Sequence, residues 1–102
     1  MEDILSNEAI AAAVEKLPGW CRSGDQLEKT YLFANFREAF AFMTRVAFEA
    51  DAMDHHPDWN NCYRELTIRL STHHAGGKIT SKDITLAAKI EACFVKRSEK
   101  GG

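Results

Sequence analysis

A change of hydrophobic period in the middle of the chain constrains the fold more than any other feature of the sequence. Between residues 35 and 53 the apolar residues recur at helical spacing, and Asn35 and Glu38 stand as in a capping box. Pro57 cannot continue a helix, so the helix is expected to end before it. Residues 66–72 then alternate apolar and polar side chains, as a strand with one buried face does. The sequence therefore predicts a long helix followed by strands of a half-covered sheet.

Two further helices and three further strands are expected from similar patterns. Ser6 can cap the first helix, and Pro18 ends it. Thr80 can cap the last helix, with Asp83 three residues later. The expected boundaries are helices over residues 6–17 and from Thr80 onward, and strands over residues 20–23, 27–34 and 59–63, the last followed by a tight turn at residues 64–65.

This order of elements predicts the fold class. Antiparallel hairpins with helices between them give an α+β fold, in which a four-stranded antiparallel sheet carries three helices on one face in the order α-β-β-α-β-β-α. A chain of 102 residues suits one domain, so residues 1–102 are expected to fold together. An open sheet leaves two edge strands, which are either blunted or used to join another subunit.

Composition and charge narrow the class of function. The net charge of -2 provides no basic surface for a phosphate backbone, so direct nucleic-acid binding is not expected. The three cysteines lack Cys-x-x-Cys spacing and are expected to be reduced thiols. No apolar run approaches the roughly 20 residues of a membrane span, and the N-terminus lacks a basic and apolar leader. A soluble, intracellular protein is therefore expected.

The candidate functional residues are histidines. All 4 histidines of the chain form two adjacent pairs, His55–His56 and His73–His74. The first pair lies in the loop that Pro57 ends, and the second follows the strand predicted over residues 66–72. A hairpin between the pairs would bring them together. Because histidine titrates near neutral pH, two or three imidazoles in one pocket can supply both an acid and a base.

Two other interpretations of the histidines stay open. Asp51 and Asp54 could join them as metal ligands, although adjacent histidines before a proline tend to diverge and no HExxH motif is present. The imidazoles could also have a purely structural role and bond to the loop backbone. The clustering of the histidines favours an acid and base site over either alternative.

The long helix raises a separate question. Its apolar stripe is expected to be formed by Phe36, Ala39, Phe40, Met43, Val46, Ala47 and Ala50. Phe42 and Phe48 lie partly off this stripe, so they are either deeper core positions or part of a subunit contact.

The residues around the histidines resemble the signature of a known family. The spacing Asp51-x3-His55-His56-Pro57-x5-Tyr63-x9-His73-x9-Asp83 is similar to that of the pterin-4a-carbinolamine dehydratases. The resemblance covers roughly residues 18 to 95 and includes the segments Asn35-Phe36-Arg-Glu-Ala-Phe-Ala-Phe-Met-Thr-Arg-Val-Ala, Asp54-His-His-Pro-Asp-Trp-Asn, Leu70-Ser-Thr-His and Asp83-Ile-Thr-Leu-Ala.

The resemblance implies a reaction and its residues. A dehydratase of this family converts 4a-hydroxytetrahydrobiopterin to quinonoid dihydrobiopterin, in the recycling of tetrahydrobiopterin, without a metal or other cofactor. The resemblance makes His55, His56 and His73 the catalytic residues. It places the substrate against Asp54, His55, His56, Trp59, Ser71, Thr72, His73 and His74. Asp51 and Asp83 would support the site. Many relatives carry an acidic residue in place of His74.

The resemblance also implies partners. Members of the family act as dimerisation cofactors, or coactivators, of a homeodomain transcription factor. They also self-associate as dimers or tetramers. A cytoplasmic location, with the nucleus as a second one, would follow.

Overall fold

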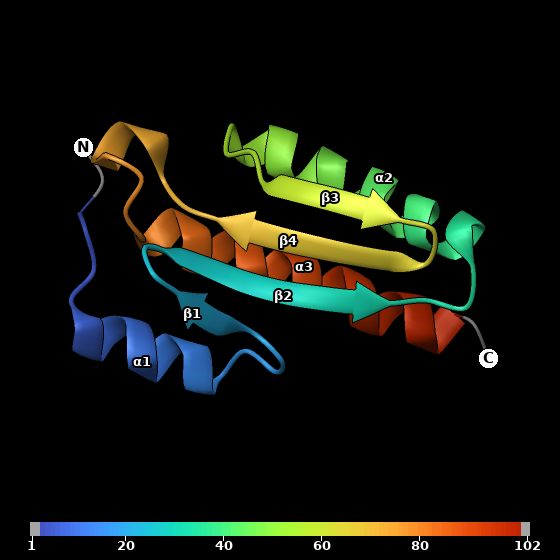
Figure 1. Ribbon diagram of the computed structural model, residues 1–102, viewed down its shortest axis with the longest axis horizontal. Coiled ribbons are helices and arrows are strands. Elements are labelled where there is room, and N and C mark those ends of the chain that lie inside the picture. Colours follow the sequence, from blue (N-terminus) through green and yellow to red (C-terminus); the bar gives the residue numbers. More distant parts are fainter. Residues whose placement is uncertain (1–2, 101–102) are drawn as a thin grey trace.

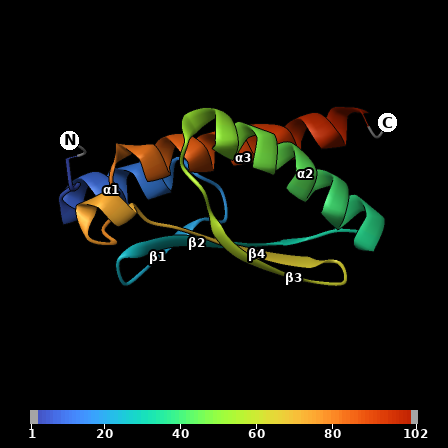
Figure 2. The same cartoon turned by 90° about the horizontal axis from the view of Figure 1, so that it is seen from above.

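The structure, a computed structural model, describes residues 3–100, and the side chains of residues 3–95. A single antiparallel sheet carries three helices on one face, and the view from above shows all three on the same side of the strands (Figures 1 and 2). The helices are α1 (Asn7–Glu15), α2 (Phe36–Met53) and α3 (Ser81–Lys100), and the strands are β1 (Cys21–Ser23), β2 (Gln26–Leu32), β3 (Asp58–Cys62) and β4 (Glu65–Leu70). The expected α+β fold and its element order are confirmed.

The strand order in the sheet is β1-β2-β4-β3, so β1 and β3 are the edge strands. Two hairpins, β1–β2 and β3–β4, join through the antiparallel pairing of β2 with β4. On β4, Leu66, Ile68 and Leu70 are buried beneath the helices, as their alternation predicts. The other face of the sheet carries polar residues such as Thr30 and Thr67, whose hydroxyls are hydrogen bonded at 2.9 Å.

Side-chain caps fix where the first two helices begin. The Ala9 N–H donates to the Ser6 hydroxyl at 3.1 Å, and the Glu38 N–H donates to the Asn35 side-chain oxygen at 2.9 Å. Each cap satisfies a backbone donor that the first turn of a helix cannot satisfy itself. The predicted caps are therefore confirmed, and α2 starts at the position that its sequence specifies.

The hairpin between β3 and β4 differs from the prediction by one residue. Cys62 pairs with Glu65, so the turn residues are Tyr63 and Arg64, not residues 64–65. Tyr63 has a φ of 55°, a left-handed conformation that two-residue hairpin turns require. Alternation alone cannot place this turn, because tyrosine is ordinarily a strand former.

The apolar stripe of α2 also differs from the prediction. The buried positions are Ala39, Phe42, Val46 and Ala50. Phe42 is therefore a core residue, whereas Phe36 and Phe40 are 48% and 54% exposed. The reason is that α2 carries apolar residues around much of its circumference, so periodicity alone does not choose the buried face.

No helix in the described part of the chain is both long and apolar enough to cross a membrane.

Candidate active site

The histidines of both pairs line one cavity. It has a volume of about 320 Å³, at the lower end of the range of roughly 300–1,000 Å³ usual for ligand sites. The end of α2, the start of β3 and the segment after β4 meet at the same end of the molecule (Figure 1). The cavity is lined by Asp54, His55, His56, Pro57, Asp58, Arg69, Ser71, Thr72, His73, His74 and Lys82. Two distant chain segments therefore contribute imidazoles to one site.

The end of α2 positions the first pair. Asp54 has a φ of 53°, a left-handed conformation that reverses the chain after the helix. The His55 N–H then donates to the Ala50 carbonyl at 3.0 Å, which ties the residue after the cap to the last turn of α2. His55 is turned back toward the helices and is only 8% exposed, whereas His56 is exposed.

The second pair lies in a short 3-10 helix, η1 (His73–Ala75), and not at the end of a strand. Strand β4 ends at Leu70, two residues earlier than predicted. Gly76 follows η1 with a φ of 72°, and its N–H donates to the His73 carbonyl at 3.0 Å. This turn requires the left-handed conformation that glycine adopts without strain. His73 and His74 are both exposed at the edge of the cavity.

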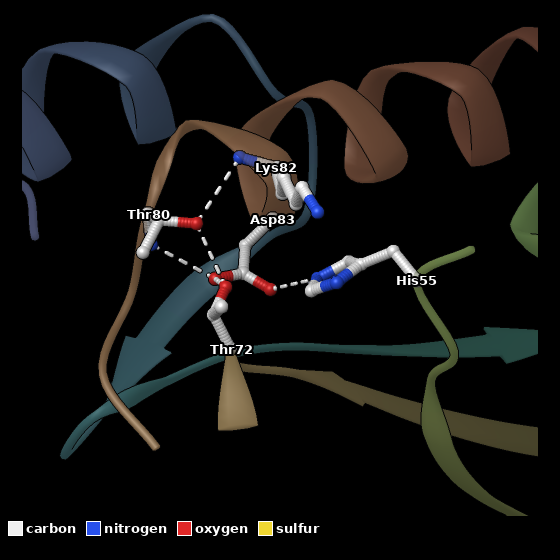
Figure 3. A network of polar contacts seen from close by, with 5 residues as sticks. All are labelled: His55, Thr72, Thr80, Lys82 and Asp83. Atoms are coloured by element: carbon white, nitrogen blue, oxygen red, sulfur yellow. Dashed lines mark hydrogen bonds and ion pairs between the residues drawn. The ribbon is translucent and has the colours of Figure 1, made fainter. Parts of the chain in front are cut away.

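A buried carboxylate lies behind His55. The Nε2 atom of His55 is 2.7 Å from Oδ1 of Asp83, which is fully buried. The other oxygen, Oδ2, accepts the Thr72 hydroxyl at 2.8 Å and the Thr80 N–H at 2.9 Å (Figure 3). Asp83 thus joins the end of α2, the segment after β4 and the first turn of α3. Buried charges are tolerated when hydrogen bonds satisfy them in this way.

The contact of His56 is of another kind. Its Nε2 atom is 3.5 Å from Oδ1 of Asp51, and the two side chains are 61% and 84% exposed. Water competes at such a pair, so Asp51 orients His56 only weakly.

Trp59 and Asp51 do not line the histidine cavity. They lie in a neighbouring groove of about 450 Å³ that α2 forms with the start of β3. Trp59 pairs with Ile68, whose side chain faces the helices, so the indole faces α2. The two cavities share the residues His56 and Pro57.

Sequence reasoning missed two cationic residues of the site, Arg69 and Lys82. Arg69 lies on the polar face of β4, and Lys82 lies in the first turn of α3. The only signal was their nearness in sequence to Ser71 and Asp83. Thr80 was predicted as a cap residue paired with Asp83, and the contact of its hydroxyl with that of Thr72 at 2.7 Å was not foreseen.

The site offers proton donors and acceptors around a polar cavity. Among the described residues, no group of three or more His, Cys, Asp or Glu side chains is arranged to hold a metal ion. The arrangement suits an elimination in which one imidazole accepts a proton and another donates one.

Comparison with known proteins agrees with this geometry. The family model described as pterin 4 alpha carbinolamine dehydratase matches residues 3–93. A protein of Opitutus terrae named as a pterin-4-alpha-carbinolamine dehydratase is 52% identical over 89% of this chain and 94% of its own length. A protein of Afipia carboxidovorans named likewise is 51% identical over 88% of this chain and 91% of its own length.

A solved structure has the same fold. The transcriptional coactivator/pterin dehydratase of Brucella melitensis superposes with a TM-score of 0.85 at 31% identity, covering 89% of this chain and 98% of that one. The expectation of a dehydratase is confirmed at the level of the family. The chain belongs to the pterin 4 alpha carbinolamine dehydratase family.

Proposed function

We propose that this chain dehydrates a pterin-4a-carbinolamine, with His55, His56 and His73 as its proton-transfer groups. The substrate would be 4a-hydroxytetrahydrobiopterin and the product quinonoid dihydrobiopterin, which places the reaction in the recycling of tetrahydrobiopterin. The observation that carries the proposal is the single cavity lined by imidazoles from two segments, one of them backed by a buried carboxylate.

The chemistry matches these groups. The hydroxyl on C4a must leave as water, so it needs a proton. The proton on N5 must be removed so that its electron pair can form the new C4a–N5 double bond. A neutral imidazole can accept the N5 proton and an imidazolium can donate to the departing hydroxyl. Each transfer by a positioned group is typically worth about 10²- to 10⁴-fold in rate.

The other residues of the cavity would bind the ring. The Asp54 carboxylate can accept hydrogen bonds from pterin N–H groups, and Lys82 can donate to the ring carbonyl. Ser71 and His74 offer further polar contacts. The indole of Trp59 lies in the neighbouring groove and would bound the site on the side of His56 and Pro57, which line both cavities.

The decay of the carbinolamine, followed by ultraviolet absorbance, tests the reaction. The protein should accelerate the decay well beyond the rate in buffer. Replacing His55 or His73 by Ala should lower the rate at least about tenfold, because one proton transfer is lost. A decay no faster than buffer would remove the dehydratase, and an unaffected double variant would remove the assigned roles.

A second candidate function is supported by the exposed face of α2. The rings of Phe36 and Phe40 are about half exposed and lie tilted against each other with their centroids 5.8 Å apart, and Phe48 is 73% exposed. Exposed apolar groups gathered on one helix are typical of a protein interface. We propose that this face mediates self-association to a dimer or tetramer, and that it can receive the dimerisation helix of a homeodomain factor, in which case the protein would also act in the nucleus.

Light scattering and a pull-down separate these possibilities. Phe40→Glu should shift the mass toward the monomer, whereas Ile4→Glu, at an equally exposed apolar residue outside α2, should not. A wild-type protein at the monomer mass would contradict self-association. A homeodomain-factor dimerisation helix that forms no complex at micromolar concentration would contradict the coactivator role.

A further inference from the structure

We propose that Thr72 and Thr80 are positioning residues of the active site, which orient Asp83 so that His55 exchanges its catalytic proton through Nδ1 alone. The inference rests on the proposed function in one respect only, namely that His55 transfers a proton. The two threonine hydroxyls would act through Asp83 and His55, so Thr72 would not itself touch the pterin.

The three side chains form a network closed to solvent. Thr72 is 1% exposed, and Thr80 and Asp83 are fully buried. The Thr72 and Thr80 hydroxyl oxygens are 2.7 Å apart, and the Thr72 hydroxyl is 2.8 Å from Asp83 Oδ2 (Figure 3). Water does not compete at such buried contacts, so each one has a strong effect on orientation.

The number of protons sets the direction of the hydrogen bonds. A hydroxyl has one proton to donate. Because Thr72 donates its proton to Asp83, the contact between the two hydroxyls requires Thr80 to donate to Thr72. The Lys82 N–H in turn donates to the Thr80 hydroxyl at 3.2 Å. The chain of donors therefore runs from the first turn of α3 through both threonines to the carboxylate.

The same reasoning fixes the tautomer of His55. Oδ2 of Asp83 already accepts from Thr72 and from the Thr80 N–H, and Oδ1 faces Nε2 of His55 at 2.7 Å. Two acceptors without a proton between them at this distance would be strongly unfavourable in a buried site. A carboxylate has no proton to donate, so the proton lies on the imidazole and Nε2–H donates to Oδ1.

This arrangement leaves one nitrogen for catalysis. Among the described residues, Asp83 is the only hydrogen-bond partner of the His55 ring. His55 also lines the cavity, so Nδ1 is the nitrogen it can offer to a substrate there. A proton accepted at Nδ1 gives an imidazolium whose Nε2–H still donates to Asp83, and a proton donated from Nδ1 restores the starting tautomer. Asp83 stays ionised and the threonines keep their hydroxyl protons throughout.

The position of Thr72 argues against a direct contact with substrate. Its hydroxyl proton is already donated to Asp83, and the side chain is almost without exposed surface. Its backbone is held as well, since its N–H donates to the Lys78 carbonyl at 2.8 Å and its carbonyl accepts from Gly77 at 2.9 Å. Loss of the hydroxyl should therefore lower kcat and leave KM nearly unchanged.

The test uses valine variants of the full chain, since valine keeps the shape of threonine and removes the hydroxyl. Thr72→Val and Thr80→Val are compared with Thr72→Ser and Thr80→Ser, which restore a hydroxyl. Thr67→Val is the matched control, because it breaks a hydroxyl pair of similar length, Thr30 with Thr67, on the open face of the sheet. The tautomer of His55 is measured by ¹⁵N NMR in the ligand-free protein, and kcat and KM are measured with the carbinolamine.

The wild-type protein and Thr67→Val should show His55 protonated at Nε2. Both valine variants at the site should show a mixture of tautomers and a kcat lowered about tenfold, the equivalent of one hydrogen bond, and the serine variants should recover most of it. A KM raised by Thr72→Val at unchanged kcat would show that Thr72 binds the pterin and would overturn the proposal.

The wild-type tautomer keeps the test decisive even where a valine variant fails to fold. A wild-type His55 protonated at Nδ1 would overturn the proposal without any variant, and serine variants that scramble the tautomer as valine does would also overturn it. A protein that lacks dehydratase activity yet shows a hydroxyl-dependent Nε2–H tautomer would count against the proposed function and leave the positioning network supported.

Discussion

Replacing Asp83 by Asn changes one buried atom and should disable His55. The carboxylate accepts from three donors, which are the His55 ring, the Thr72 hydroxyl and the Thr80 N–H. An amide has one oxygen, and two of the donors occupy the position of Oδ2. The amide oxygen will lie there, so its NH₂ group will face Nε2 of His55. The imidazole must then accept at Nε2 and carry its proton on Nδ1, which is the wrong tautomer for catalysis.

The size of the effect follows from this tautomer change. A general acid or base typically contributes about 10²- to 10⁴-fold, which corresponds to about 3–5 kcal/mol of transition-state stabilisation. Loss of the aspartate behind a catalytic histidine in serine proteases, by the same substitution, lowers kcat by about 10⁴-fold. Because Asp83 is fully buried, it makes no contact with substrate, and KM should change less than about threefold.

Steady-state kinetics of carbinolamine decay, with circular dichroism as a check of folding, measures this effect. Asp51→Asn is the matched control, since Asp51 also contacts a histidine but is 84% exposed at 3.5 Å from it, and its effect should stay below about threefold. A folded Asp83→Asn protein that keeps a tenth or more of the wild-type kcat would refute the reasoning.

Three further substitutions are predicted to affect stability. Tyr31→Phe should lower the free energy of unfolding in urea by about 1.5–3 kcal/mol, because the Tyr31 hydroxyl donates to the carboxylate of Glu91. Burial, and then Glu91, raise the pKa of Tyr31, so the unfolded chain loses the hydroxyl proton at a lower pH than the folded one. The free energy of unfolding should therefore fall as the pH rises above about 10, and Tyr31→Phe should reduce this dependence. Asn35→Ala should lower the free energy of unfolding by about 1 kcal/mol, because the cap of α2 is lost. Ile68→Ala should lower it by about 2–5 kcal/mol, because Ile68 is fully buried. Both effects are measured as shifts of the urea midpoint.

The elements that could be predicted from the sequence are those with two independent signals. Helix α2 combines a helical period with an Asn35 cap, and β4 combines alternation with strand-forming residues such as Thr67 and Ile68. The turn at Tyr63 has one signal only, and that signal favours a strand. Its position is set by the pairing of Cys62 with Glu65, which is a property of the hairpin and is not visible in either strand alone.

The alternation of side chains across the sheet could have placed the Trp59 indole more accurately. Trp59 and Ile68 form a directly opposed pair in neighbouring strands, so their side chains share a face of the sheet. The alternation of residues 66–72 shows that this face is the one beneath the helices. The nearness of Trp59 to His56 in sequence favoured the histidine cavity, although the pleat of β3 directs the indole toward α2.

The role of Asp83 shows why a site can be only partly predicted. As a cap residue it was expected to accept from Thr80, and its Oδ2 does so at 2.9 Å. A carboxylate has a second oxygen, and nothing in the local sequence indicates that His55, 28 residues away, is the partner of that oxygen. Only the packing of the end of α2 against α3 determines this contact.

The two ends of the site differ in a way that suits an elimination. His55 is buried and fixed through Asp83, whereas His73 lies exposed in η1. An imidazole that is held rigidly loses little entropy when it meets the substrate, and an exposed one can exchange protons with water between turnovers. Because Asp83 belongs to the first turn of α3, fraying of that turn would release His55 from its carboxylate and leave His73 in place. Loss of activity would then precede loss of the fold, since the core residues that α3 contributes, such as Leu86 and Ile90, lie beyond its first turn.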